Sequence, residues 1–342
     1  MDFLTLGKIV KDRQVPLLLS LTRNFVTPMY RASFLASAAS SGVLACLAVR
    51  PCDLDTLAAR LGATGDPRLL SAWLDLGVRL GDLGWDDGCY KLRSRTAKAL
   101  ARKRNDAVTA ALEEVVRFHL PVVAGAPGML RDGRRLSIED QDGAVIARST
   151  RVIQPFVEEA ITRTLVRNTP VRLLEVGCGS GTYVRYAAGL NPRLTALAID
   201  LQQDVADEAA KNMAEWGLGD RVETRQGDLR DLDLEPQFDL VTLHNNIYYI
   251  PEAERVAALA RARSLLAPGG RLLLTTSCQG GSAGIEVLNL WFEYADFGGP
   301  LPVEHELVAQ IEEAGFRDVQ ARRLIPGEQF RAFTGTNAPE ES

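Results

Sequence analysis

The sequence lacks the features that mark nucleic-acid-binding, membrane and disulfide-stabilised proteins. The net charge of the 342 residues is −5, so no overall positive charge favours nucleic acid or an anionic membrane. The five cysteines form no C-x-x-C pair and leave an odd count, which favours reduced thiols in a cytoplasmic protein over a disulfide framework. We expect no targeting or transmembrane segment and see no internal repeat. The first residues lack a basic stretch followed by an apolar core, and the uncharged stretch 33–49 is short for a membrane span and rich in alanine and serine.

A dinucleotide fingerprint is also incomplete. Residues 171–183 read as a buried strand that ends in a tight loop and opens a helix, with Gly177, Gly179 and Gly181 in the loop. The G-x-G-x-x-G pattern needs a further glycine where this chain has Thr182. Glu175 lies just ahead of the loop, where a carboxylate suits a cationic ligand better than a pyrophosphate.

Two further strands are expected to end in acidic residues. Residues 194–200 end at Asp200, which can hold the hydroxyls of a ribose, and residues 221–228 end at Asp228, which can accept a hydrogen bond from an adenine amino group. Three acidic strand ends suit a ligand with an ammonium group, a ribose and an adenine but no phosphate. The pattern Glu-x-Gly-x-Gly-x-Gly resembles motif I of class I methyltransferases, which use S-adenosylmethionine (SAM). That resemblance implies a SAM site built from Glu175, Gly177, Gly179, Gly181, Asp200, Leu201, Gly227, Asp228 and Leu229.

The same resemblance organises the rest of the chain. From residue 171 onward strands alternate with helices, which predicts a parallel sheet covered on both faces and closed by an antiparallel pair at 316–324 and 329–334. We predict an α/β, Rossmann-like class I methyltransferase sheet with an N-terminal, mainly helical, winged-helix-like domain. We assign residues 1–105 to this winged-helix-like domain, which the resemblance implies is a dimerisation domain. Residues 106–168 are assigned to a helical connector that covers the substrate, and residues 169–342 to the SAM-binding catalytic domain.

The N-terminal part reads as three helices and a hairpin. Helices are expected at 42–50, 53–62 and 66–83, with a hairpin at 84–95 that turns at Asp87 and Gly88. The module is similar to the dimerisation domain of small-molecule O-methyltransferases, which implies a homodimer. Phe25, Met29 and neighbouring apolar residues could pack against a partner subunit. A DNA-binding wing is less favoured, because isolated motif matches need structural context and the basic residues at 93–104 also fit a solvated surface.

The residues expected around the methyl acceptor are unusual for that group. Alignment on the small-molecule O-methyltransferases places Tyr248 where those enzymes commonly have a general-base histidine. An unperturbed tyrosine is a poor base at neutral pH. His244 follows the fourth strand and His305 begins a later helix, so the two could hold an iron or zinc ion, with Asp296 as a third ligand. Arg131 in the connector, or else Arg148 or Arg151, could bind a substrate carboxylate.

The length, the layout and the residues Leu-His-Asn-Asn-Ile-Tyr-Tyr at 243–249 resemble the bacterial 2-oxo acid C-methyltransferases. This resemblance implies methylation of the β-carbon of a 2-oxo acid, such as phenylpyruvate or 4-methyl-2-oxopentanoate, through a metal-stabilised enolate. His244, Tyr248 and Arg131 are then the candidate catalytic residues. One alternative is a small-molecule O-methyltransferase of natural-product biosynthesis, which would be indifferent to chelators. Another is a winged-helix regulator that binds a ligand without turnover.

Overall fold

A computed structural model describes residues 14–338, and the chain forms two compact units. Within the described residues, the first unit contains residues 14–120 and 142–152, and the second contains residues 121–141 and 153–338. The division into domains at 1–105, 106–168 and 169–342 stays a prediction, since the connector contributes to both units. Within residues 14–338 no single helix is long and apolar enough to cross a membrane, although Gln14–Ser40 and Val43–Val49 together, as a bent pair, pass that test.

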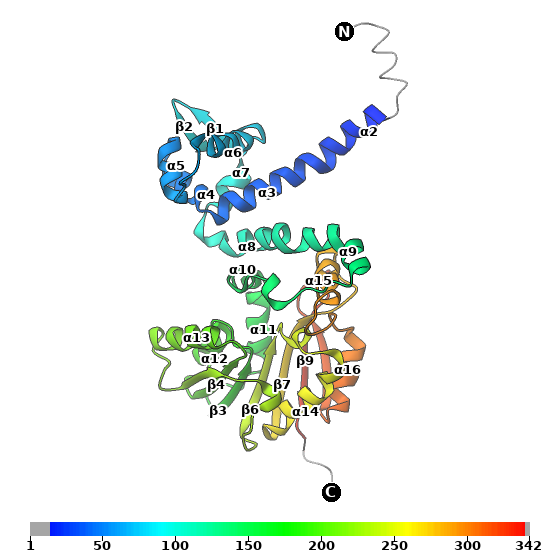
Figure 1. The fold of residues 1–342 in the computed structure, drawn as a ribbon. Coiled ribbons are helices and arrows are strands. Elements are labelled where there is room, and N and C mark those ends of the chain that lie inside the picture. Colours follow the sequence, from blue (N-terminus) through cyan, green and yellow to red (C-terminus); the bar gives the residue numbers. More distant parts are fainter. Residues whose placement is uncertain (1–13, 339–342) are drawn as a thin grey trace. The chain divides into compact units, whose positions relative to one another are not determined.

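The first unit begins with a long helical run that contains a π-helical turn (Figure 1). The expected three helices and hairpin follow it, and Asp87 and Gly88 have φ of 46° and 75°, as a tight hairpin turn requires. The elements are α2 (Gln14–Leu21), η1 (Thr22–Val26), α3 (Thr27–Ser40), α4 (Val43–Val49), α5 (Leu54–Leu61), α6 (Pro67–Arg79), β1 (Leu83–Asp86), β2 (Cys89–Leu92), α7 (Arg95–Leu100), η2 (Lys103–Asn105), α8 (Asp106–Glu114), η3 (Val115–His119), α10 (Gly143–Ser149) and η5 (Thr150–Val152).

The core of this unit closes around α3 and α6. Phe34 packs against Trp73, with 5.1 Å between the ring centroids, and its ring occupies the space that a side chain at Gly77 would need. Asp82 is fully buried and accepts two hydrogen bonds from Arg31 and one from Ser94, so its charge is compensated. The apolar residues of the helical run fall into two groups. Phe34 of α3 is buried, whereas Phe25 of η1 and Met29 of α3 are more than half exposed.

The second unit is built on a seven-stranded sheet with the order β5-β4-β3-β6-β7-β9-β8 (Figure 1). The strands are β3 (Val171–Val176), β4 (Leu194–Asp200), β5 (Val222–Gln226), β6 (Phe238–His244), β7 (Leu266–Ser277), β8 (Arg317–Arg323) and β9 (Phe330–Thr336). The helical elements are α9 (Leu120–Asp132), η4 (Ile138–Asp140), α11 (Gln154–Thr164), α12 (Thr182–Leu190), α13 (Gln203–Glu215), η6 (Leu229–Asp231), η7 (Ile247–Tyr249), η8 (Glu252–Glu254), α14 (Arg255–Ser264), α15 (Ala283–Glu293) and α16 (Glu304–Glu313).

Both faces of the centre of this sheet are covered. Leu272, Leu273 and Leu274 are consecutive residues of β7 and all are fully buried, which requires packed side chains on both faces. One face packs against α11, α12 and α13 through a single apolar cluster that includes Leu173, Leu240 and Leu273. Strands β3 to β7 run parallel, while β9 pairs antiparallel with both β7 and β8. The predicted α/β fold, with a helical region ahead of a Rossmann-like sheet, is therefore confirmed.

The chain direction places the carboxyl ends of β3, β4, β5 and β6 at one edge of the sheet. From β3 the connections proceed outward to β4 and β5, and then return to β6 on the other side of β3. In open α/β sheets, ligands bind beyond the carboxyl ends of the strands at such a reversal of strand order. The candidate site is therefore expected where β3 and β6 end.

Candidate active site

The glycine loop after β3 has the backbone that the sequence predicts. Gly177, Gly179 and Gly181 have φ of 66°, 53° and 79°, a region that favours glycine. A Cβ atom at Gly177 would lie 2.6 Å from Asn246 Nδ2, and one at Gly181 would lie 2.2 Å from Met213 Cε. Glycine is needed at both positions for conformation and for space, because the loop after β6 and helix α13 approach the glycine loop so closely.

Asp200 at the end of β4 holds this loop. Its Oδ2 accepts a hydrogen bond from the backbone N–H of Gly179 at 3.0 Å, and its Oδ1 accepts one from Gln202 at 3.3 Å. Burial raises the pKa of the Asp200 carboxyl, although these backbone hydrogen bonds favour the ionised form. The next residue, Leu201, exposes 54% of its surface beside the loop. The expected ribose-binding residue thus lies within hydrogen-bonding distance of the glycine loop.

The residues that follow β5 are joined by hydrogen bonds to β4 and within η6. The Gly227 N–H donates to the Asp200 carbonyl at 2.9 Å, and Leu229 is buried. Asp228 caps η6 by accepting from the Arg230 N–H, and it also pairs with the Arg230 guanidinium at 2.7 Å. Burial acts to raise the pKa of Asp228, but the hydrogen bonds and charge of Arg230 outweigh burial and keep that pKa below its usual value.

A buried polar cluster lies where β3 and β6 end. Glu175 accepts a hydrogen bond from Thr242, and its Oε2 lies 3.9 Å from His244 Nε2. His244 Nδ1 is 2.8 Å from Thr275 Oγ1 on β7. Glu175 Oε1 and His244 Nε2 are both buried and have no hydrogen-bond partner among the described residues. We call Glu175, Thr242, His244 and Thr275 the strand-end cluster.

Burial shifts both titratable groups of this cluster towards their neutral forms. It raises the pKa of Glu175 to about 8, partly opposed by the Thr242 hydrogen bond, and lowers the pKa of His244 to about 3. The two side chains are therefore a carboxylic acid and a neutral imidazole at neutral pH in this structure. The sequence does not reveal this pairing, because Glu175 and His244 are 69 residues apart and meet only through the pairing of β3 with β6.

Asn246 is a further site residue that sequence reasoning missed. Its Nδ2 donates to the Val176 carbonyl at 2.5 Å, so its amide joins the loop after β6 to the end of β3. Its Oδ1 is buried and has no partner within residues 14–338. The preceding Asn245 has φ of 56°, which turns the chain sharply after β6. The Asn-Asn pair after a buried strand was the available signal, since asparagine tolerates the left-handed region.

An aromatic cluster follows the strand-end cluster along the chain. Tyr248 and Tyr249 of η7 pack against Phe292 of α15, with centroid distances of 4.6 Å and 5.3 Å, and Phe297 and Trp291 complete the group. Tyr248 is 7% exposed. Gly298 lies so close that a Cβ atom there would be 2.2 Å from the Tyr248 carbonyl oxygen. Aromatic packing thus helps to fix the loop after β6, together with the Arg255 guanidinium, which donates to the Ile250 carbonyl at 3.2 Å.

The remaining predicted residues do not gather into a metal site. His305 is exposed on α16, Asp296 is exposed after α15, and the side chain of His244 is 1% exposed with its ring between Thr275 and Glu175. Within residues 14–338, no three His, Cys, Asp or Glu side chains are grouped so that they could hold a metal ion. The donor set of His244 and His305 therefore does not fit a metal in this structure.

The candidate carboxylate-binding arginines are engaged elsewhere. Arg131 exposes 76% of its side chain and pairs with the adjacent Asp132 at 3.3 Å. Arg148 and Arg151 of the first unit both pair with Asp106. The roles of Arg131, Arg148 and Arg151 in binding a carboxylate stay predictions.

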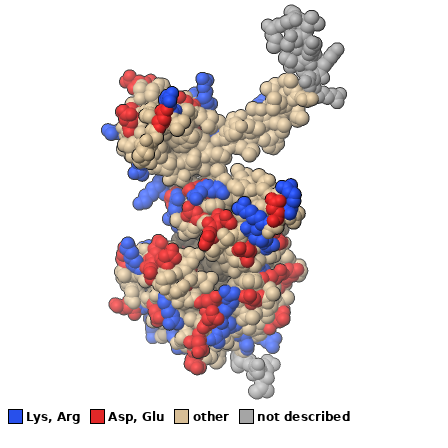
Figure 2. Space-filling view, in the orientation of Figure 1, with Lys and Arg blue, Asp and Glu red and all other residues tan. Residues whose placement is uncertain are grey.

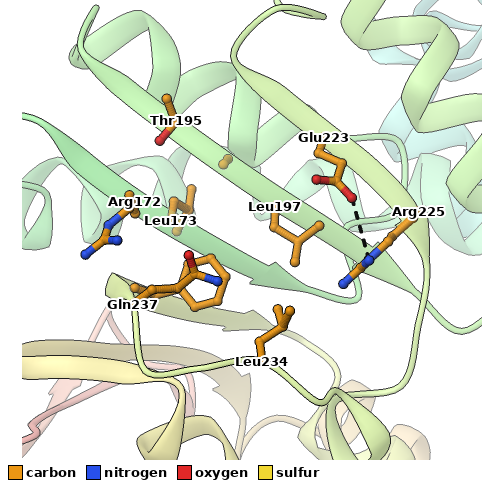
Figure 3. A pocket seen from close by; sticks show the side chains of 10 residues that line it. Arg172, Leu173, Thr195, Leu197, Glu223, Arg225, Leu234 and Gln237 are labelled. Atoms are coloured by element: carbon orange, nitrogen blue, oxygen red, sulfur yellow. Dashed lines mark ion pairs between the residues drawn. The ribbon is translucent and has the colours of Figure 1, made fainter.

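A shallow hollow of about 220 Å³ lies on the sheet away from these groups (Figure 3). Its walls come from the amino-terminal and central parts of β3, β4 and β5 and from the segment that leads to β6. Leu173, Leu197 and Leu234 contribute apolar surface, and the exposed Arg225 and Glu223 form an ion pair at 3.7 Å. The hollow is therefore separate from the carboxyl ends that carry the glycine loop.

Comparisons with known proteins agree with this geometry. A family model described as a methyltransferase domain matches residues 174–272. A demethylspheroidene O-methyltransferase of Rhodobacter capsulatus is 27% identical over 196 residues, which cover 55% of this chain and 48% of the relative. A ubiquinone biosynthesis O-methyltransferase of Xanthomonas euvesicatoria is 35% identical over 107 residues, which cover 31% of this chain and 42% of the relative. The chain thus spans about half the length of the curated relatives that it matches.

Solved structures match over almost the whole chain. The mitomycin 7-O-methyltransferase MmcR superposes with a TM-score of 0.75 at 18% identity, covering 94% of this chain and 98% of that chain. Human N-acetylserotonin methyltransferase in complex with SAM superposes with a TM-score of 0.70 at 18% identity, covering 96% of this chain and 99% of that chain. At these identities the likeness shows the fold. Together with the family match to residues 174–272, it leads to one conclusion: the chain has the class I methyltransferase fold, and part of its second unit is similar to a methyltransferase domain.

Proposed function

We propose that this chain binds SAM at the glycine loop and transfers its methyl group to a hydroxyl oxygen of a small molecule. The observation that carries the proposal is the loop itself: three glycines with positive φ, fixed by Asp200 on one side and Asn246 on the other. Gly177, Gly179, Gly181, Asp200, Leu201, Gly227, Asp228 and Leu229 would surround the cofactor. When bound, SAM supplies an electrophilic methyl group.

The groups at this edge fit a cofactor that carries a positive charge and hydroxyls. Asp200 offers carboxylate oxygens beside the backbone of Gly179, and the buried Asn246 Oδ1 is an acceptor without a partner among the described residues. Glu175 is 1% exposed and accepts from Thr242, so it ties β3 to β6 beneath the loop. Its contact with the cofactor stays a prediction, and its buried Oε1 is also without a partner among the described residues. We expect Glu175 to position the loop and the neighbouring acceptors to bind the cofactor.

Oxygen is favoured as the acceptor atom by two of the curated relatives, whose names describe O-methyltransferases. The side chains at the site narrow the acceptor further. His244 is held neutral, with a pKa near 3, and Tyr248 stands where a general-base histidine was expected. Neither group is suited to remove a proton at neutral pH. We therefore expect an acceptor whose hydroxyl ionises readily by itself, such as an acidic phenol or an enol, with the protein supplying orientation.

Methylation of the β-carbon of a 2-oxo acid remains the second candidate. It rests on the resemblance of residues 243–249 to C-methyltransferases, and it needs a metal that His244 and His305 do not fit in this structure. An enol of a 2-oxo acid could present either its oxygen or its carbon to the methyl donor. The position of the new methyl group therefore separates the two candidates.

We also propose that the chain forms a homodimer through its first described helices. Between residues 14 and 30 the only charged side chain is Arg23, and none of the residues of α2 is buried. Leu17, Leu18, Leu19, Phe25, Met29 and Tyr30 each expose more than half of their surface. Figure 2 shows this largely uncharged surface along the helical run. A helix that is apolar all round requires a covering surface, and a second copy offers one of matching character.

The function is tested by incubating the purified protein with SAM carrying a labelled methyl group and a panel of phenols, enols and 2-oxo acids, with and without a chelator. We expect label on oxygen, at a rate that the chelator leaves unchanged. A product methylated on the β-carbon, formed only without chelator, would support the C-methyltransferase candidate instead. Failure of any acceptor to gain label, together with no binding of SAM by calorimetry, would remove the enzymatic proposal.

Asp200→Asn should weaken the binding of SAM by about tenfold, because a charged hydrogen bond contributes roughly 1.5 kcal/mol or more. The substitution keeps the shape of the side chain, and its Oδ1 can still accept from Gly179. Asp220→Asn, on the exposed turn before β5, is the matched control and should leave the dissociation constant unchanged. Equal affinities for the two variants in calorimetry would exclude Asp200 from the cofactor site.

Glu175→Gln should change how stability depends on pH. The raised pKa of Glu175 means that its protonated form stabilises the fold, fully below pH 4.5 and less and less as pH rises through 8. Between pH 6.5 and 8, His244 is neutral in the folded protein and titrates from its ordinary pKa of 6.5 in the unfolded protein. This contribution is the same in wild type and variant, so it cancels when the two pH profiles are compared. In this window the free energy of unfolding of the wild type should fall with pH by up to about 1.4 kcal/mol per pH unit more than that of the variant.

Denaturant unfolding at several pH values measures this difference. The exposed Glu223→Gln on β5 should follow the wild type. Parallel pH profiles for wild type and Glu175→Gln would show that Glu175 is ionised in the folded protein.

Leu18→Asp should convert the dimer to a monomer, because it places a charge in the apolar surface of α2. Leu69→Asp is the matched control, since Leu69 is 72% exposed on α6 of the same unit. Sedimentation velocity gives the mass of each species. A monomeric wild type, or a dimer that survives Leu18→Asp, would rule out this interface.

A further inference from the structure

Two cysteines of the first unit lie close together, and nothing in the proposed methyl transfer uses them. Cys46 is on α4, and Cys52 follows the end of that helix by three residues. Their Sγ atoms are 3.5 Å apart. Both belong to or pack against the apolar core of the unit, so neither thiol is held at the surface by a charged partner.

The backbone of Cys52 is fixed, whereas the Cys46 side chain lies on the more accessible side. Cys52 exchanges two backbone hydrogen bonds with Tyr90 of β2, at 3.1 Å and 2.8 Å. Its Sγ also lies 3.3 Å from the Arg50 carbonyl oxygen, and the residue is 3% exposed. Cys46 is only partly buried. An oxidant can therefore reach Cys46 first, and Cys52 is placed directly behind it.

We propose that Cys46 and Cys52 form a reactive dithiol that closes to an intramolecular disulfide under oxidation. A disulfide requires an S–S separation of about 2.05 Å, so the two sulfur atoms must approach by roughly 1.5 Å. The separation of six residues makes the loop to be closed short, and the fixed Cys52 backbone keeps the partner in place. The bond would join α4 to the strand bridge between Cys52 and Tyr90.

The reaction is a thiol–disulfide exchange with a small disulfide such as oxidised glutathione. The Cys46 thiolate attacks one sulfur of that disulfide, forms a mixed disulfide and releases one thiolate. The Cys52 thiolate then attacks Cys46 Sγ and releases the second thiolate. The two cysteine thiols lose two protons and two electrons in total, and the small disulfide becomes two thiols. Burial raises the pKa of the Cys52 thiol, so the second step should accelerate at alkaline pH.

Wild-type protein treated with oxidised glutathione tests the proposal directly. Trypsin does not cleave the Arg50–Pro51 bond, so residues 32–60 form one peptide that contains both cysteines. We expect this peptide to appear about 2 Da lighter than its reduced form and to resist alkylation until it is reduced. The count of free thiols in the denatured protein should fall from five to three.

Single cysteine substitutions test whether Cys46 and Cys52 are the two residues that form the disulfide. Cys89→Ser, in the adjacent strand β2, is the matched control and should still form the light peptide. Cys52→Ser should stop at a glutathione adduct on Cys46, and Cys46→Ser should lose the rapid reaction. A wild-type peptide that keeps two alkylatable thiols, or a lasting glutathione adduct on folded wild type, would overturn the proposal without any variant.

Discussion

The turn between β3 and α12 is the constraint on which the candidate site depends. Three glycines must adopt positive φ for the chain to reverse there, and two of them are also pressed against neighbouring side chains. The turn is kept in place from both sides, by Asp200 through the Gly179 N–H and by Asn246 through the Val176 carbonyl. The adjacent strands therefore determine the shape of the loop, and the loop determines where a ligand can approach the backbone.

The strand-end cluster beneath this turn is uncharged in the folded protein. A carboxylic acid and an imidazole lie 3.9 Å apart, and burial favours the neutral form of each. Two buried groups that could form an ion pair in water are instead kept neutral, because separating the charges from solvent costs more than their attraction returns. This arrangement makes His244 a poor base, so the proposed chemistry depends on positioning and on the acidity of the acceptor.

The sequence was most informative where local chemistry decides the structure. Glycine spacing predicted the loop, Asp87 and Gly88 predicted the hairpin turn, and apolar runs ending in acids predicted β3 and β4. It was least informative where residues far apart in sequence meet. The burial that keeps Glu175 neutral depends on the pairing of β3 with β6, which also brings Thr242 and His244 beside it, and no local pattern records that contact.

The predicted metal site also depended on residues far apart in the sequence. His244 and His305 were joined because both follow elements that border the acceptor region, but α16 leaves His305 exposed while β6 buries His244. The aromatic cluster around Tyr248 was also missed, since its rings come from η7, α15 and the segment after α15. Sequence spacing identifies candidate residues. Which of them come into contact depends on which face of each helix or strand packs against the core.

The order of the last strands has a consequence for synthesis. β9 is made after β8 but lies between β7 and β8, so β8 has no strand to pair with until residues 330–336 have left the ribosome. Until then the outer edge of β7 carries unpaired backbone groups and an apolar face, which invites pairing with other chains. The growing chain therefore passes through a period in which a chaperone that shields β7 would protect it from aggregation.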